Sequence, residues 1–95
     1  MFKDLDPLLH NQLRLSIISL LMNVESAEFN YLLNQTKATR GNVSVQINKL
    51  KEAGYIEVTK SFRDNYPLTT CKITKVGLNA FEKYVEAISG YLNRK

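Results

Sequence analysis

The spacing of apolar residues changes along this chain, and this change restricts the fold more than any other feature of the sequence. Before Gly54, apolar residues recur every three or four positions, which is the period of an amphipathic helix. From Tyr55 to Ile73, β-branched and aromatic residues alternate with polar ones, which indicates strands. After Thr74 the helical spacing returns. The pattern predicts helices first, then a pair of strands, then a last helix.

Two helices are expected in the first part of the chain. The first covers about 7–23, with Asp6 as its cap and Pro7 in the first turn, where a missing N–H leaves no hydrogen bond unmade. The second is shorter, begins after the cap residue Ser26 and ends near 35–36. Each presents one apolar face for a shared core.

The third helix is predicted from about Arg40 to Ala53. Thr39 precedes it as a cap, and Gly54 follows it at the position where a left-handed residue closes a helix. The second and third helices, joined by a short turn, form a helix-turn-helix. The core-facing residues of the third helix, four and three positions apart, are Val43, Ile47 and Leu50.

The alternating segment predicts two strands, over 55–60 and 68–73, which pair as a hairpin. The polar residues 61–67 between them predict a loop of about six to eight residues, longer than a tight β-turn. Thr74 caps a last helix over 75–92. The apolar face of that helix contains Phe81, Tyr84, Val85, Ile88 and Leu92.

This order is mainly α with a β-hairpin, and we interpret it as a winged helix-turn-helix. The 95 residues are expected to form one domain, with the helix-turn-helix and a two-stranded wing over 7–74 and a C-terminal helix over 75–92. The net charge of +4 is unevenly distributed. Residues 39–75 contain seven Lys or Arg against three Asp or Glu, a net of +4, whereas 1–38 have a net of −1. A concentration of positive charge of this kind is typical of a phosphate-binding surface.

Membrane, secretory and disulfide classes are not supported by the sequence. No uninterrupted apolar run approaches the roughly 20 residues of a membrane span, and the charged N-terminus lacks a signal-peptide cleavage site. Cys71 is the single cysteine and is expected to be a buried strand residue in a reducing compartment. These observations predict a cytoplasmic protein that does not contact membranes.

Four motifs resemble the small MarR/ArsR-like winged-helix transcriptional regulators. Leu5–Leu15 is similar to their opening, and Thr39–Ser44 to the start of their recognition helix. Leu50–Ile56 is similar to the exit from that helix, and Thr74–Gly77 to the beginning of their last helix. The resemblance spans Leu5–Leu92 and implies sequence-specific binding of duplex DNA, usually by a homodimer.

The chain departs from that family in three respects. The metal-sensing branch uses clustered Cys and His ligands, but His10 and Cys71 are far apart here, so no metal or other cofactor is expected. The longer members build a ligand pocket with extra terminal helices that this chain lacks, so an effector stays unassigned. The wing segment 61–67 contains one Arg and one Asp and is less basic than a strong minor-groove binder requires.

The residue types on the outer face of the third helix favour a base-reading role. This face is short and polar, and Asn and Ser are poor helix formers that an ordinary solvated face seldom uses. Asn reads adenine through a paired donor and acceptor, and an apolar side chain contacts a thymine methyl. The predicted DNA contacts are Arg40, Asn42, Ser44, Val45, Gln46, Asn48 and Lys49, with Gln46 toward the flank.

The wing and the last helix supply two further expectations. Lys60, Arg63 and Lys72 are candidates for phosphate or minor-groove contacts, with an ordinary solvated charge as the alternative for each. The end of the last helix extends beyond what a small core covers, which favours a two-fold interface between copies over a helix folded back on its own domain. The residues expected at this interface are Tyr84, Ile88, Tyr91 and Leu92.

Two functions without DNA binding are possible alternatives, and a third alternative is a DNA-binding sensor whose dimer interface holds a small ligand. The sequence supplies no specific ligand residues for the sensor, so that alternative stays open. An enzyme is disfavoured, because the sequence has no phosphate-binding Gly loop, no metal-spaced cluster and no catalytic triad pattern. A winged-helix module that joins proteins without binding DNA is the main alternative, since fold alone does not decide function. The polar third-helix face and the positive charge around it favour double-stranded DNA.

Overall fold

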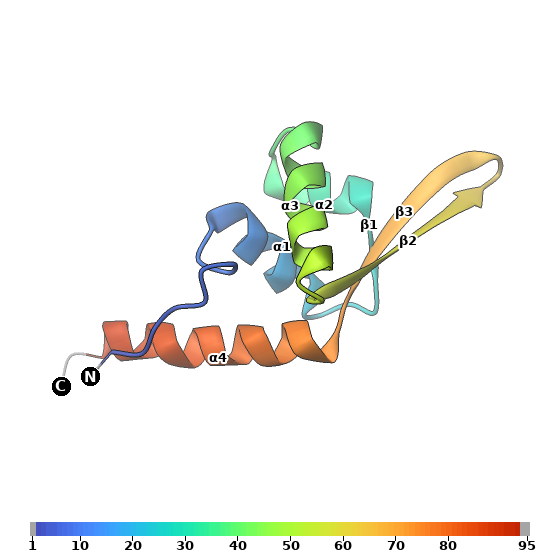
Figure 1. The fold of residues 1–95 in the computed structure, drawn as a ribbon. Helices are drawn as coiled ribbons and strands as arrows, with labels where there is room; N and C mark the ends of the chain where they lie inside the picture. The colour runs from blue at the N-terminus through green and yellow to red at the C-terminus, as the bar shows by residue number, and fades with distance from the viewer. Residues whose placement is uncertain (1, 94–95) are drawn as a thin grey trace.

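The computed structural model describes residues 2–93, which form a helix-turn-helix, a small antiparallel sheet and a long last helix (Figure 1). The sheet has the order β1-β3-β2, and β2 and β3 form a hairpin that extends away from the helices (Figure 1). The elements in chain order are α1 (Gln12–Leu21), β1 (Ala27–Glu28), α2 (Phe29–Thr36), α3 (Arg40–Glu52), β2 (Ile56–Arg63), β3 (Tyr66–Ile73) and α4 (Lys75–Leu92). The predicted winged helix-turn-helix is confirmed.

One apolar core joins α1, α2, α3 and the base of the sheet. Burial of these side chains supplies most of the driving force for folding. Cys71 of β3 is fully buried in this core, as predicted. The other fully buried members are Leu9, Ile17, Ile18, Leu21, Leu32, Val43 and Leu50.

The first helix is shorter than predicted. Asp6 does cap a turn, because its Oδ1 accepts a hydrogen bond from Leu8 N at 2.9 Å, but that turn ends at His10. Asn11 is extended, with φ −152°, and its side chain accepts a hydrogen bond from Arg14 N, so α1 begins at Gln12. The prediction of a single helix over 7–23 is wrong, because a second cap interrupts it.

The segment before α2 is a strand, so the prediction of Ser26 as a helix cap is also wrong. Ala27 pairs with Cys71 and Glu28 pairs with Thr70 on the outer edge of β3. A two-residue strand is too short to show alternation, and its pairing partner lies more than forty positions away along the chain. Its formation is a tertiary effect.

The hairpin closes with a two-residue turn and not with the predicted loop of six to eight residues. Asp64 and Asn65 have φ of 51° and 69°, and two left-handed residues in succession are the signature of a type I′ turn. The strands therefore continue to the pair Arg63 and Tyr66. Pro67 is tolerated within β3 because β1 ends before it and leaves its outer side without a neighbouring strand.

The bounds of α3 and α4 and their caps agree with the predictions. Thr39 Oγ1 accepts from Asn42 N at 3.1 Å at the start of α3, and Gly54, with φ 80°, follows its end. Thr74 Oγ1 accepts from Gly77 N at 3.0 Å at the start of α4. Both threonines satisfy an N–H that the first turn of a helix leaves without a partner.

The residues that follow α3 make hydrogen bonds and close contacts with those that begin α4, and we call this contact the α3–α4 junction. Thr74 N donates to Tyr55 O at 3.0 Å, and Thr74 Oγ1 donates to Gly54 O at 2.6 Å. A Cβ on Gly77 would lie 2.2 Å from Tyr55 O, so only glycine permits this approach. Two motifs that are separate in sequence therefore meet in one structural unit.

The second half of α4 extends beyond the helical body, and the N-terminal segment runs beside it (Figure 1). Lys3 Nζ forms an ion pair with Glu86 at 3.2 Å, and Tyr91 Oη donates to Lys3 O at 3.2 Å. Phe2 stacks on Tyr91 with ring centroids 4.6 Å apart. Among residues 2–93, no helix has both the length and the apolar character needed to cross a membrane.

Candidate nucleic-acid interface

The two faces of α3 differ in burial as the sequence predicts. Val43, Ile47 and Leu50 are at most 4% exposed. The opposite face is open to solvent, and its apolar member, Val45, is 49% exposed. The exposed candidates on this face are Arg40, Asn42, Ser44, Val45, Asn48 and Lys49. An exposed polar helix face supplies hydrogen-bond donors and acceptors to a partner without disturbing the core.

A groove of about 390 Å³ separates this face of α3 from the wing. Arg40, Ser44 and Asn48 lie on its α3 side, and Lys60 lies on its wing side. Phe29 and Asn30, at the start of α2, also line the groove. The structure thus brings together three predicted α3 contacts and one predicted wing contact that is twelve or more positions distant in sequence.

Arg40 is fixed in position by two residues at the start of α2. Its guanidinium carbon lies 5.0 Å from the centre of the Phe29 ring, a cation–π contact. Its Nη2 donates to Asn30 Oδ1 at 3.1 Å. Sequence reasoning missed Phe29 and Asn30, because both are remote from α3 in the chain and resemble ordinary residues of α2.

Gln46 differs from the other α3 candidates because its side chain is occupied within the protein. It is half-buried, and its Oε1 accepts a hydrogen bond from Arg14 Nη1 of α1. Its Nε2 donates to Asn42 Oδ1 at 2.9 Å. Arg14 also donates from Nε to Leu8 O at 2.6 Å. Gln46 is therefore placed to orient Asn42, and Arg14 is a supporting residue that the sequence analysis missed.

The three wing candidates do not share one face of the sheet. Val58 and Cys71 are opposite partners on the core-facing side, and because faces alternate along a strand, Lys60 shares that side. Arg63 and Lys72 lie on the other side, and Arg63 forms an ion pair with Glu28 at 2.9 Å. Only Lys60 of the three faces the groove beside α3.

The predicted dimer residues on α4 divide into buried and exposed members. Tyr84 is 7% exposed, and its hydroxyl lies 3.0 Å from His10 Nδ1, so it packs within its own chain. Ile88 is half-buried. Tyr91 and Leu92 are 45% and 73% exposed. The surface available to a second copy is therefore smaller than the sequence analysis expected and lies at the end of α4.

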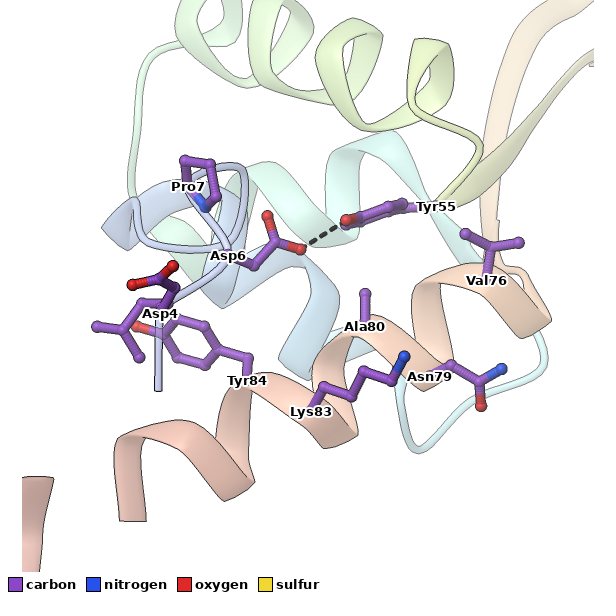
Figure 2. Close-up of a pocket in the computed structure, with 10 residues that line it drawn as sticks. Asp4, Asp6, Pro7, Tyr55, Val76, Asn79, Ala80, Lys83 and Tyr84 are labelled. Carbon is purple, nitrogen blue, oxygen red and sulfur yellow. Dashed lines mark hydrogen bonds between the residues drawn. The ribbon is translucent and has the colours of Figure 1, made fainter. Parts of the chain in front are cut away.

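A second cavity, of about 560 Å³, lies between the N-terminal segment and α4 (Figure 2). Tyr55 points into it, and its hydroxyl donates to Asp6 Oδ2 at 2.5 Å (Figure 2). Burial, and then the hydrogen bond to and the charge of Asp6, raise the pKa of Tyr55 to about 12. This contact joins the N-terminal segment to the α3–α4 junction.

A family model described as a winged helix DNA-binding domain matches residues 13–92. The chain belongs to the winged-helix DNA-binding domain family. This winged-helix protein is 39% identical over 75 residues to an uncharacterised protein of Methanocaldococcus jannaschii, covering 79% of this chain and 82% of that one. The predicted resemblance to small regulators of the MarR type is confirmed at the level of the family.

Solved structures give the same result for the fold. The transcriptional regulator homologue from Pyrococcus horikoshii superposes with a TM-score of 0.83 at 25% identity, covering 90% of the winged-helix chain and 84% of its own. The transcriptional regulator BldR from Sulfolobus solfataricus has a TM-score of 0.74 at 20% identity and covers 87% of this chain, which spans 58% of BldR. The winged-helix protein thus shares its fold with these two regulators.

Proposed function

We propose that this winged-helix protein is a transcriptional regulator that binds specific sequences in double-stranded DNA as a homodimer. In this proposal α3 enters the major groove, and the wing lies on the flanking backbone or minor groove. The observation that carries it is the exposed polar face of α3 beside a groove that contains Arg40 on one side and Lys60 on the other.

Base reading is assigned to the exposed residues of α3. Asn42 and Asn48 offer the paired donor and acceptor that adenine requires, and Ser44 donates or accepts. Val45, 49% exposed, offers a methyl surface to thymine. Nothing lies within 4 Å of a Cβ built on Gly41, so the DNA backbone can approach the first turn of α3 closely.

Phosphate binding is assigned to Arg40, Lys49 and Lys60. Arg40 and Lys60 lie on opposite sides of the groove, so one DNA strand that crosses the groove would meet a cation on each side. The Asn30 and Phe29 contacts limit the conformational freedom that Arg40 loses on binding. The net charge of +4 over residues 39–75 attracts DNA whatever its base sequence and steers its approach.

The homodimer is assigned to the exposed end of α4. Leu92 is 73% exposed on a helix that extends beyond the domain (Figure 1). Pairing of two such helices about a two-fold axis would bury this surface and present two copies of α3. Two recognition helices of a dimer reach successive major grooves when they are roughly 34–36 Å apart.

The test is a fluorescence-anisotropy titration of a labelled random-sequence duplex at several salt concentrations. The logarithm of the binding constant should fall linearly with the logarithm of salt concentration, with a slope of about −0.9 for each phosphate neutralised. An absence of binding at low salt would overturn the proposal and favour the protein-interaction module instead.

Charge-removing variants locate the interface within that titration. Lys49→Ala and Arg40→Ala should each make the salt slope shallower by about 1 and weaken binding by about tenfold at low salt. Lys83→Ala, which removes the same charge from α4 beside the second cavity, is the matched control and should leave the slope unchanged. Equal slopes for all four proteins would place the DNA elsewhere on the surface.

A further inference from the structure

Two aromatic side chains at the tip of the wing are almost fully exposed. Phe62 of β2 is 76% exposed and Tyr66 of β3 is 75% exposed. Pro67, opposite Phe62, is exposed as well. The tip lies far from the helical core (Figure 1), so these side chains contribute little to the stability of the fold.

The strand register puts the two aromatic residues on opposite faces of the wing. Phe62 pairs with Pro67, and Tyr66 pairs with Arg63. Directly opposed residues share a face, and faces alternate along each strand. Phe62 therefore shares the face of Lys60, which borders the groove beside α3, whereas Tyr66 lies on the far face. Phe62 extends the wing side of the groove toward the tip.

The charge at the tip does not suit a cationic reader of the minor groove. Arg63 is the single basic residue of 61–67, and it is on the far face, where its Nη2 donates to Glu28 at 2.9 Å. Asp64 adds a negative charge at the turn. On the groove face, the residue beyond Lys60 is apolar.

We propose that Phe62 enters the minor groove as an apolar wedge at a base step beside the sequence that α3 reads. Apolar side chains that insert in this way partly unstack the step and kink the duplex. Pyrimidine–purine steps such as TA unstack most easily, so the wing selects DNA by deformability at a position where it makes no base-specific hydrogen bond. This inference rests on the proposed function, and it adds a specificity-determining residue to it.

Continuity with the groove identifies DNA as the occupant of this face. Lys60, two positions before Phe62, faces the same side as the polar groove lined by Arg40 and Asn48. A duplex that contacts α3 and Lys60 has its next phosphates and its minor groove in the direction of the tip. Along this face of the wing, the charge of Lys60 suits a phosphate of the DNA backbone, and the ring of Phe62 suits the base edges beyond it.

The test compares two duplexes that contain A·T pairs alone, one with alternating TA steps and one with a continuous A-tract. Both have the same minor-groove acceptors, so they differ there in flexibility and groove width. The A-tract is stiff with a narrow groove that attracts cations, whereas the TA repeat kinks easily. With an aromatic wedge, the wild type should favour the TA duplex over the A-tract about tenfold more strongly than a chain without the wedge does at equal salt.

Three variants separate the wedge from other properties of the wing. Phe62→Ala should lose about tenfold in affinity for the TA duplex and lower the ratio of the TA affinity to the A-tract affinity by a similar factor relative to wild type. Phe62→Leu keeps an apolar wedge and should keep most of the preference. Tyr66→Ala removes an equally exposed aromatic ring from the far face and should leave the ratio unchanged. The readout by α3 is common to all four proteins and cancels when their ratios are compared.

A 2-aminopurine base in one TA step gives a second readout, because its fluorescence rises when the base unstacks. The rise is expected with wild type and Phe62→Leu and not with Phe62→Ala. Equal ratios for wild type and Phe62→Ala would overturn the wedge while leaving DNA binding intact. A wild-type chain that binds neither duplex at low salt would overturn the proposed function, and the wedge with it.

Discussion

Two glycines of α4 have opposite surroundings, and substitutions at them should have opposite effects on stability. A Cβ on Gly77 would lie 2.2 Å from Tyr55 O and 3.0 Å from Ile73 Cγ1, whereas nothing lies within 4 Å of one on Gly90. Gly77→Ala should lower the free energy of unfolding by about 1–3 kcal/mol, since α4 must move from the α3–α4 junction. Gly90→Ala should raise it by about 0.5–1 kcal/mol through helix propensity.

Thermal unfolding followed by circular dichroism measures both glycine variants under identical conditions. The prediction concerns the sign of each change relative to wild type, with Gly90→Ala as the internal control. A Gly77→Ala variant at least as stable as the wild type would mean that Gly77 does not make a close approach in solution.

The hydroxyl of Tyr55 should make stability depend on pH in the alkaline range. Its pKa is raised from 10.0 to about 12 in the folded chain, so the folded state favours the protonated form. The corresponding stability is fully present below about pH 10 and is lost as pH rises to about 12, because the unfolded state releases the proton first. Tyr55→Phe lacks this proton, and its stability should fall less over the same range.

Urea unfolding of wild type and Tyr55→Phe at a series of pH values checks this prediction. Lysine titration affects both proteins equally and cancels in the difference between them. A difference in unfolding free energy that stays constant between about pH 10 and pH 12, the range over which the folded and unfolded states differ in protonation, would contradict the assigned role of the Asp6–Tyr55 contact.

Single residues with a local role were predictable from the sequence. Thr39, Thr74 and Gly54 satisfy or close the nearest turn of a helix, and that requirement is visible within four positions. Gln46 was assigned to base contacts, but the structure shows its side chain bonded to Arg14, thirty-two positions away. A partner at that distance leaves no local pattern, so its effect on a site residue required the structure.

At the scale of elements, the strong periodicity of apolar residues predicted which helices exist. Competing short-range signals gave wrong bounds for the first helix. The helices α3 and α4 match the predicted bounds almost residue for residue, because a cap and an unbroken apolar face define each one. In the first helix, two caps, Asp6 and Asn11, compete, and the later one begins the helix. Sequence alone does not rank two good caps.

The hairpin shows how turn chemistry was underestimated. Asp64-Asn65 fits a type I′ turn, because both residue types tolerate the left-handed conformation better than most. The polar residues around the turn and Pro67 suggested a loop, yet a proline on the edge of a hairpin does not break it. Because the strands are longer than predicted, the wing extends farther from the helices and Phe62 lies near its tip.

For the whole molecule, the order of elements predicted the architecture, and the face of α3 predicted the candidate interface. What the sequence did not contain was the position of the wing relative to α3, which leaves Lys60 at the groove and Arg63 and Lys72 away from it. Those positions depend on strand register, and register follows from the turn that was not foreseen.

The prediction for the whole molecule concerns its oligomeric state. Leu92→Glu should weaken self-association by at least about tenfold, because it would put a charge in an apolar interface. Leu92 is 73% exposed in the single chain, so the substitution should leave the fold of the single chain intact. Val76→Glu adds the same charge to an exposed valine in the first turn of α4 and is the matched control.

Sedimentation velocity over a range of concentrations measures this association. The wild type and Val76→Glu should sediment as dimers at concentrations where Leu92→Glu sediments as a monomer. A wild-type chain that remains monomeric at every concentration, or a Leu92→Glu chain that associates like the wild type, would exclude the end of α4 as the dimer surface.

The α3–α4 junction fixes the angle between α3 and α4. The helix proposed to face DNA and the helix proposed to face a second copy are joined through Thr74, Gly77 and the backbone of Gly54 and Tyr55. With α4 about 27 Å long at 1.5 Å per residue, a tilt of about 10° at the junction displaces its far end by about 5 Å. That displacement exceeds the rise of one base pair, about 3.4 Å. In such a dimer, two proteins with identical recognition helices would prefer different distances between half-sites if their junctions held α4 at different angles. Gly77 and Thr74 would then set the spacing of the two recognition helices without contacting DNA.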